Sequence, residues 1–213
     1  MRATIKAQLI VMATRERSGL VRRVVGSVTD RVIHSSPIPM MVVPPDNEYD
    51  IGQWVPRSII VPLDGSELAK TALAHAEAVE RAAMIPITLV RSVSVPTTFG
   101  ADSYGGIPSE FPNCAEEDIK AVELYLDEIA IRLRARGHQI GIHVGTGHPP
   151  NEICRVSWET ENAMVVMTTR GASGLTRWVV GNVADSVIRL SGVPVLVIPP
   201  GHRSLTPAPE ILD

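Results

Sequence analysis

Residues 9–45, LIVMATRERSGLVRRVVGSVTDRVIHSSPIPMMVVPP, return later in the chain as residues 164–200, MVVMTTRGASGLTRWVVGNVADSVIRLSGVPVLVIPP. The two copies align without a gap at an offset of 155 residues, and about half of their positions are identical. Identity of this extent over a unit of this size does not arise by chance. The stretch is therefore a duplicated structural unit.

Each copy has the pattern of a strand, a loop, a helix and a second strand. The opening run, residues 9–12 or 164–167, is apolar, as buried parallel strands are. A loop with Gly, Ser and Arg follows, and valine then recurs every fourth residue, which is typical of a helix. The closing run, residues 39–43 or 194–198, ends at a Pro-Pro pair, because proline cannot extend a strand ladder. The unit is therefore a βαβ unit with the usual right-handed crossover.

The second copy is preceded by the further elements that complete a sheet. Alternation and periodicity predict strands at residues 58–63, 86–93 and 139–144 and helices over residues 67–83, 115–136 and 149–159. Residues 94–115 are rich in Pro, Gly and Ser and are expected to form a long loop. The resulting order, β-α-β-α-β-α-β-α-β, predicts an α/β fold. It is a doubly wound, open, five-stranded parallel sheet, here preceded by a partial βαβ repeat.

The length of the chain agrees with this organisation, since 213 residues are many for one compact domain and few for two. We expect a partial domain, its C-terminal βαβ unit only, over residues 1–46 and an acidic polar linker over 47–56. A complete domain over 57–200 and a disordered tail over 201–213 follow. The alternative is that Met1 is not the natural start of the chain and that an upstream part of the first domain is missing.

Composition excludes several classes of protein. A hydrophobic share of 45% excludes a disordered chain, and a net charge of −3 leaves no broad positive surface for nucleic acid. No apolar stretch approaches the roughly 18 residues that a membrane helix needs, and no signal peptide is expected. Cys114 and Cys154 have neither zinc nor redox spacing. They are expected to be reduced thiols in a cytoplasmic protein.

Two segments at the carboxyl ends of the strands are candidates for ligand binding, because open α/β sheets bind ligands where their strand order reverses. One is residues 61–66, VPLDGS, and the other combines residues 167–171, MTTRG, with residues 181–183, GNV. Glycines let the backbone approach a ligand closely, and a helix N-terminus favours phosphate. The alternative is that the glycines only shape turns and that Asp64 only makes ordinary turn and cap contacts.

The familiar catalytic and metal motifs are absent from the sequence. It has no Walker pattern, no Gly-x-Gly-x-x-Gly after the first strand of the complete domain, no His-Glu-x-x-His helix and no Gly-x-Ser-x-Gly elbow. The six histidines are scattered, and His148 is expected to be a solvated loop side chain. We therefore expect neither a metal site nor a catalytic residue.

At these residues the sequence resembles the universal stress protein family. The stretches that carry the resemblance are residues 59–66, IIVPLDGS; 167–175, MTTRGASGL; 180–183, VGNV; and 194–199, PVLVIP. The resemblance covers about residues 57–200 as one whole domain and about residues 7–45 as the last third of another. It implies an adenine nucleotide alpha hydrolase-like fold, usually dimeric, in which many members bind ATP, here expected together with Mg²⁺.

The ATP signature of that family is Gly-x2-Gly-x9-Gly followed by Ser or Thr. Thr168 and Asn182 depart from it at the first and the last of the four positions, and Gly171 and Gly181 keep the other two. Asn182 retains a side chain that can cap a helix and donate to phosphate. The resemblance implies an adenine side at Pro62, Asp64 and Ser92, a ribose and phosphate contact at Met167, Thr168 and Gly171, and a phosphate end at Gly181, Asn182 and Val183.

The first copy differs from the second at the signature positions. It has Ala13, Glu16, Gly26 and Ser27 there, and the carboxylate of Glu16 repels phosphate. Its adenine half is also missing from the sequence. The first copy is not expected to bind nucleotide unless a partner chain supplies that half. The resemblance therefore implies one nucleotide site per chain, in the second copy.

Three functions are compatible with the resemblance. The first is a cytoplasmic ATP-binding regulatory protein of the stress response. The second is a dimerisation or interaction module that does not bind nucleotide and has a degenerate cleft. The third is a slow ATP hydrolase. We expect no enzymatic activity beyond slow ATP hydrolysis.

Members of the family often pair their last strand with the same strand of a partner across a dimer axis. Residues 39–43 are therefore expected to pair with residues 194–198 within one chain. Such a pseudo-dimer imitates the contact of a homodimer and covers an exposed sheet edge. A homodimer of two chains is the alternative.

Overall fold

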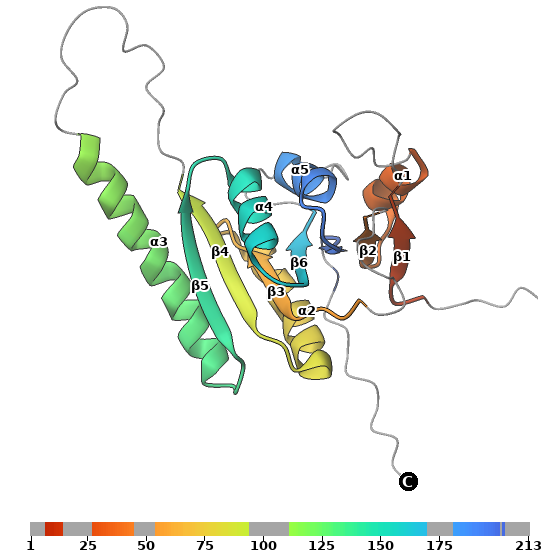
Figure 1. Ribbon diagram of the computed structural model, residues 1–213, viewed down its shortest axis with the longest axis horizontal. Coiled ribbons are helices and arrows are strands. Elements are labelled where there is room, and N and C mark those ends of the chain that lie inside the picture. The colour runs from red at the N-terminus through yellow and green to blue at the C-terminus, as the bar shows by residue number, and fades with distance from the viewer. Residues whose placement is uncertain are drawn as a thin grey trace, which may run out of the picture.

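The computed structural model describes residues 7–14, 27–44, 54–93, 111–169, 181–200 and 202. One seven-stranded sheet runs through them in the order β1-β2-β7-β6-β3-β4-β5 (Figure 1). The strands are β1 Ile10–Ala13, β2 Met40–Val43, β3 Ser58–Pro62, β4 Ile87–Val93, β5 Ile140–Thr146, β6 Ala163–Thr168 and β7 Val195–Ile198. The helices are α1 Ser27–Ser35, α2 Glu67–Ala83, α3 Phe111–Arg134, α4 Pro149–Glu159 and α5 Asn182–Leu190.

The predicted five-stranded parallel sheet is confirmed. Strands β7, β6, β3, β4 and β5 lie side by side and every pair among these neighbours is parallel. Helices α2 and α4 have the bounds that the sequence predicts. Each begins after a clear signal, which is the Ser66 cap for α2 and the proline at the first helical position for α4.

Both ends of one helix differ from the prediction, since residues 115–136 are predicted and α3 spans Phe111–Arg134. The sequence places residues 94–115 in a loop, whereas α3 already begins at Phe111. Proline is tolerated in the first turn of a helix, so Pro112 does not prevent this earlier start. The rest of the predicted loop, residues 94–110, lies outside the described residues.

Helices cover both faces of the sheet. On one face, α2 and α3 pack over a core that includes Ile59 and Val61 of β3. On the other face, α1, α4 and α5 pack over a core that includes Ile60. Successive side chains of a strand point to opposite faces, so a strand that is apolar throughout supplies both cores. All of Ser58, Ile59, Ile60 and Val61 are buried accordingly.

The duplicated sequence is duplicated in the structure, residue by residue. Ile10 pairs with Met40 in the first copy as Val165 pairs with Val195 in the second, and both strand pairs are parallel. The helices α1 and α5 have the same length and occupy corresponding positions. The offset of 155 residues read from the sequence therefore holds for every element of the unit.

The two copies meet at an antiparallel contact between β2 and β7, which confirms the predicted pseudo-dimer. Met41 lies opposite Leu196 at its centre, and Met40 opposite Val197 and Val42 opposite Val195 on either side. At the offset of 155 residues Met40 corresponds to Val195 and Val42 to Val197, so exchanging the two copies turns one outer pair into the other. The contact therefore has the symmetry of a two-fold dimer interface, formed within one chain. Since β7 also pairs with β6, it keeps no free edge for the same contact with a second chain.

The chain after β7 returns to α2. His202 Nδ1 lies 3.2 Å from Nε2 of the fully buried His75, whose Nδ1 lies 3.2 Å from the carbonyl oxygen of Thr71. Burial lowers the pKa of His75, and the neighbouring His202 acts in the same direction. The other residues of the predicted tail, 201 and 203–213, lie outside the described residues.

Among the described helices, none is long and apolar enough to cross a membrane.

Candidate functional site

The order of the parallel strands reverses between β3 and β6. From β3 the chain crosses to α2 on one face, and after β6 it reaches α5 on the opposite face. In such sheets the ends of these two strands are where ligands bind. The residues that the sequence singled out follow Pro62 at the end of β3 and Thr168 at the end of β6.

The loop after β3 is held by its own side chains. Asp64 Oδ1 accepts hydrogen bonds from the Ser66 backbone N–H at 2.9 Å and from Ser66 Oγ at 2.6 Å. Ser66 Oγ in turn accepts from the Ala69 N–H at 3.1 Å and caps α2. The turn-and-cap role considered for Asp64 is therefore present, and it fixes the position of an exposed carboxylate at the end of β3.

Gly65 occupies a position that other residues would not tolerate. Its φ of +91° lies in the left-handed region, and a Cβ there would lie 2.8 Å from Nη1 of Arg91. The Arg91 guanidinium also lies 4.9 Å from the ring centroid of Tyr125, and the Lys70 ammonium lies 5.7 Å from it. Two cations and an aromatic ring thus lie beside the loop that carries Asp64.

Sequence reasoning missed Arg91, Tyr125 and Lys70 because they come from three separate elements and form no motif. The one available signal was Arg91, a charged residue in the otherwise uncharged strand ITLVRSV. The hydroxyl of Tyr125 is buried and has no hydrogen-bond partner among the described residues, and burial raises its pKa.

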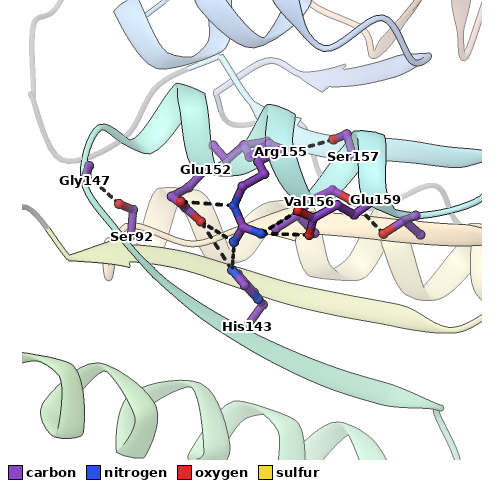
Figure 2. Close-up of polar contacts among 10 residues, drawn as sticks. Ser92, His143, Gly147, Glu152, Arg155, Val156, Ser157 and Glu159 are labelled. Atoms are coloured by element: carbon purple, nitrogen blue, oxygen red, sulfur yellow. Dashed lines mark hydrogen bonds and ion pairs between the residues drawn. The ribbon is translucent and has the colours of Figure 1, made fainter.

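Ser92, expected on the adenine side, makes a structural contact. Its Oγ donates to the Gly147 carbonyl oxygen at 2.6 Å, and the Gly147 N–H donates to the Val93 carbonyl oxygen at 2.8 Å. Figure 2 shows the Ser92–Gly147 bond at the end of β5, just before α4. Ser92 therefore ties the end of β4 to the turn after β5.

The end of β6 is joined to the start of α5. The Thr169 N–H donates to the Ile198 carbonyl oxygen at 3.0 Å, and the Thr169 carbonyl oxygen accepts from the Gly181 N–H at 2.6 Å. Gly181 is the N-cap of α5, and Asn182, expected as a cap, is the first helical residue and is exposed. The first turn of α5 thus lies at the end of β6, and the N–H groups at a helix N-terminus favour an anion.

The side chains at the end of β6 are buried. Met167 is 5% exposed and packs in the core under α4 and α5, and Thr168 is 6% exposed. Alternation places Thr168 on the same face as Val166, which is the face that α2 covers. Val183 is half-buried against the α4–α5 core. Gly171, the remaining predicted contact, lies outside the described residues, as do Arg170 and Arg177.

A second polar cluster lies on β5 and α4 and is drawn in Figure 2. Arg155 Nη2 lies 2.8 Å from Glu152 Oε2, its Nη1 lies 2.7 Å from Glu159 Oε2, and its Nη2 donates to His143 Nε2 at 3.0 Å. The same Nε2 lies 3.4 Å from Glu152 Oε2, so the imidazole contacts both the guanidinium and the carboxylate. The hydrogen bond from Arg155 lowers the pKa of the Glu152 carboxyl.

Replacing Gly145 with alanine is expected to lower the free energy of unfolding by about 1–3 kcal/mol, the usual cost of overpacking. A Cβ at Gly145 would lie 2.7 Å from Cγ of Glu152 and would push that side chain away from Arg155. Urea unfolding measures the loss. The matched control is Gly141→Ala on the same strand, where the nearest atom to a Cβ is Thr88 Oγ1 at 3.6 Å. Equal effects of the two substitutions would contradict the prediction.

The expectations for histidine, cysteine and metal ligands can be compared with the described residues. His148 is exposed at the start of α4, as expected of a solvated side chain. Cys154 is free and buried, and burial raises the pKa of its thiol to about 11. In the described ranges no three His, Cys, Asp or Glu side chains are grouped so that they would hold a metal ion. The side chain of Cys114 lies outside the description.

The sheet, the duplicated unit and the paired loop and helix start agree with a known family. The sequence model of the universal stress protein family matches residues 1–44 and 56–199. The chain belongs to the universal stress protein family. Its fold is accordingly the doubly wound α/β fold that the sequence predicted, which the solved structures of the family share.

Two relatives and one solved structure illustrate the likeness. Universal stress protein YxiE of Bacillus subtilis is 30% identical over 145 residues, which are 67% of this chain and 98% of YxiE. A universal stress protein of Mycobacterium tuberculosis is 26% identical over 196 residues, 90% of this chain and 62% of the relative. A universal stress protein of Archaeoglobus fulgidus has a TM-score of 0.65 at 23% identity and is matched by 91% of this chain over 63% of its own length. The chain thus spans less than two thirds of the last two proteins.

Proposed function

We propose that this universal stress protein binds one adenine nucleotide, ATP with Mg²⁺, at the ends of β3 and β6 and acts as a cytoplasmic regulatory protein of the stress response. The observation that carries the proposal is the 2.6 Å hydrogen bond from the Gly181 N–H to the Thr169 carbonyl oxygen. This bond keeps the N-terminus of α5 beside the end of β6, and a helix N-terminus favours phosphate.

The proposed contacts follow from where the side chains lie. Pro62, Asp64 and Ser92 stand at the ends of the adjacent strands β3 and β4 and form the adenine side. Asp64 is exposed and oriented by Ser66, so its carboxylate is in position to accept from a ligand N–H. Ser92 donates its proton to Gly147 and keeps lone pairs on its oxygen as acceptors.

The ribose and phosphates are assigned to the ends of β6 and the start of α5. Met167, Thr168 and Gly171 meet the ribose and the first phosphates, and Gly181, Asn182 and Val183 meet the far phosphates. Burial of the Thr168 side chain on the α2 face supports the assignment, since it leaves the backbone rather than the methyl group toward the nucleotide. The exposed side chain of Asn182 supports a phosphate contact at the first turn of α5.

The alternative is an interaction module that binds no nucleotide. Two observations favour it: the signature departs from the family at Thr168 and Asn182, and both Asp64 and Ser92 already bond to their own chain. We keep the division into a partial domain over 1–46 and a complete domain over 57–200 as part of either proposal. A slow hydrolysis of ATP is the limit of the enzymatic activity that we propose.

Isothermal titration of the purified chain with ATP and Mg²⁺, ADP and AMP tests the function. We expect one site per chain, and the absence of heat with all three nucleotides overturns nucleotide binding and favours the interaction module.

Asn182→Glu is expected to weaken ATP binding about tenfold or more, because its carboxylate repels phosphate. An acidic residue in the first turn of a helix leaves stability intact. The control is Asn151→Glu, which makes the same change in the first turn of α4, where it is also exposed.

A further inference from the structure

The two copies of the repeat have the same backbone arrangement but different surroundings. Val166 of β6 is fully buried, whereas Val11, its counterpart in β1, is 63% exposed. Met164 is 2% exposed, whereas its counterpart Leu9 is 42% exposed. The first copy therefore has apolar side chains at these two positions although they are exposed there. The corresponding side chains of the second copy are buried.

The difference comes from one neighbour that the described residues supply to β6 and not to β1. Strand β6 lies between β7 and β3, and β3 pairs with it in parallel, with Ile59 opposite Met164 and Ile60 opposite Val165. Helix α2, which follows β3, packs over Val166. Strand β1 has β2 on one side, and no element of the described chain lies beyond it (Figure 1).

Within the described part of the chain, no strand pairs with the outer edge of β1. The Ile10 N–H donates to the Pro39 carbonyl oxygen at 3.0 Å and the Thr14 N–H to the Val43 carbonyl oxygen at 2.9 Å. These groups point toward β2, so the amides of Val11 and Ala13, which alternate with them, point to the open edge. Residues 7–14, AQLIVMAT, contain no charge and no proline, and therefore lack the usual protection of an edge strand against pairing.

We propose that the edge and the Val11 face of β1 bind a strand–helix segment in trans, with the strand parallel to β1. The template is the β6–β3 interface of the same sheet. The two-fold symmetry of the β2–β7 contact relates β6 to β1, so the open edge is the symmetric continuation of an interface that is already formed. The segment has the chemistry of β3 and α2: an uncharged apolar strand and a helix with a face of small side chains.

A helix is part of the proposed partner because an edge strand alone leaves Val11 exposed. In the second copy Ala69, Ala72 and Ala76 of α2 lie in the core that covers Val166. A second copy of this chain that used its own β1 would pair antiparallel about a two-fold axis and would cover the edge but not this face. The template therefore favours the parallel strand and helix over a homodimer.

A synthetic peptide of residues 57–84 of this chain, labelled with a fluorophore, tests the proposal by anisotropy on titration with the full chain. We expect saturable binding that Val11→Glu weakens about tenfold or more. Ile131→Glu on α3 is the matched control, because Ile131 is also 63% exposed, and it is expected to leave binding unchanged. Hydrogen exchange at the amides of Val11 and Ala13 is expected to slow about tenfold or more when the peptide is bound.

Three results overturn the proposal. The first is the absence of binding with soluble peptide and a folded chain. The second is binding that Val11→Glu does not change, which means that the peptide replaces β3 beside β6. The third is a dimer in sedimentation that depends on Val11 while the peptide is not taken up, which means that a second copy covers β1. Hydrogen exchange on the unsubstituted chain distinguishes these cases without any variant.

Discussion

Replacing His138 with alanine is expected to lower the free energy of unfolding by about 3 kcal/mol. The side chain of His138 is 3% exposed and lies between two carboxylates of α2. Its Nδ1 forms a hydrogen bond with Glu80 Oε2 at 2.8 Å, and its Nε2 lies 3.1 Å from Glu77 Oε2 without hydrogen-bond geometry. Removal of the imidazole leaves the Glu80 carboxylate buried without this partner. The loss of stability is therefore far larger than when an exposed histidine is removed.

Glu77 is expected to contribute less to this loss than Glu80. Its Oε2 also lies 3.2 Å from Arg81 Nη2 and 3.2 Å from Arg136 Nη1, so two guanidinium groups still compensate it after the substitution. Both arginines are more than half exposed, and their pairs contribute little individually. The effect is therefore assigned mainly to the contact between His138 and Glu80.

Urea unfolding measures the effect of His138→Ala, with His148→Ala as the control because His148 is exposed. The double variant His138→Leu with Glu80→Leu is expected to recover most of the loss, since an apolar pair of similar volume needs no charge compensation. A loss below about 1 kcal/mol for His138→Ala, or no recovery in the double variant, would contradict this account of the cluster.

Replacing Met40 with alanine is expected to lower the free energy of unfolding by about 2–5 kcal/mol. Met40 is 2% exposed, pairs with Val197 across the contact between the two copies and packs in the core under α1, α4 and α5. Its truncation leaves a cavity where the two copies join. The size of the expected effect depends on the first copy being part of the same cooperative core as the second.

Met84→Ala is the matched control for Met40, because it removes the same side chain from a position that is 81% exposed. Urea unfolding of both variants is combined with hydrogen exchange at residues 40–43. If Met40→Ala speeds exchange in the first copy alone and leaves global unfolding unchanged, the first copy unfolds by itself and the proposed common core is wrong.

The fold could be predicted largely because its signals are local or repeated. The Pro-Pro pairs at residues 44–45 and 199–200 mark the ends of two copies of one unit, and an exact repeat of register follows from the repeat of sequence. The antiparallel contact at Met41 and Leu196 was implied by the family resemblance, because members of that family often pair their last strand across a dimer axis. The start of α3 at Phe111 was missed because Pro112 is typical both of a loop and of a first helical turn.

The candidate site could be predicted only in part. The position of Asp64, Gly181 and Asn182 at the ends of the strands follows from topology, because carboxyl ends of parallel strands share one edge. The contacts of Arg91 with Tyr125, and of His138 with Glu80, join residues that are far apart in the sequence. No local sequence pattern predicts such contacts, so they could be identified only in the structure.

The central claim is a single adenine nucleotide site per chain at the ends of β3 and β6. Residue-level hydrogen exchange with and without ATP and Mg²⁺ tests it most directly. We predict that the nucleotide slows exchange at residues 64–66, 168–169 and 181–183 and leaves the corresponding residues of the first copy, 13–14 and 27–28, unchanged. Equal protection in both copies, or no protection at residues 181–183 in a chain saturated with ATP, would contradict the claim.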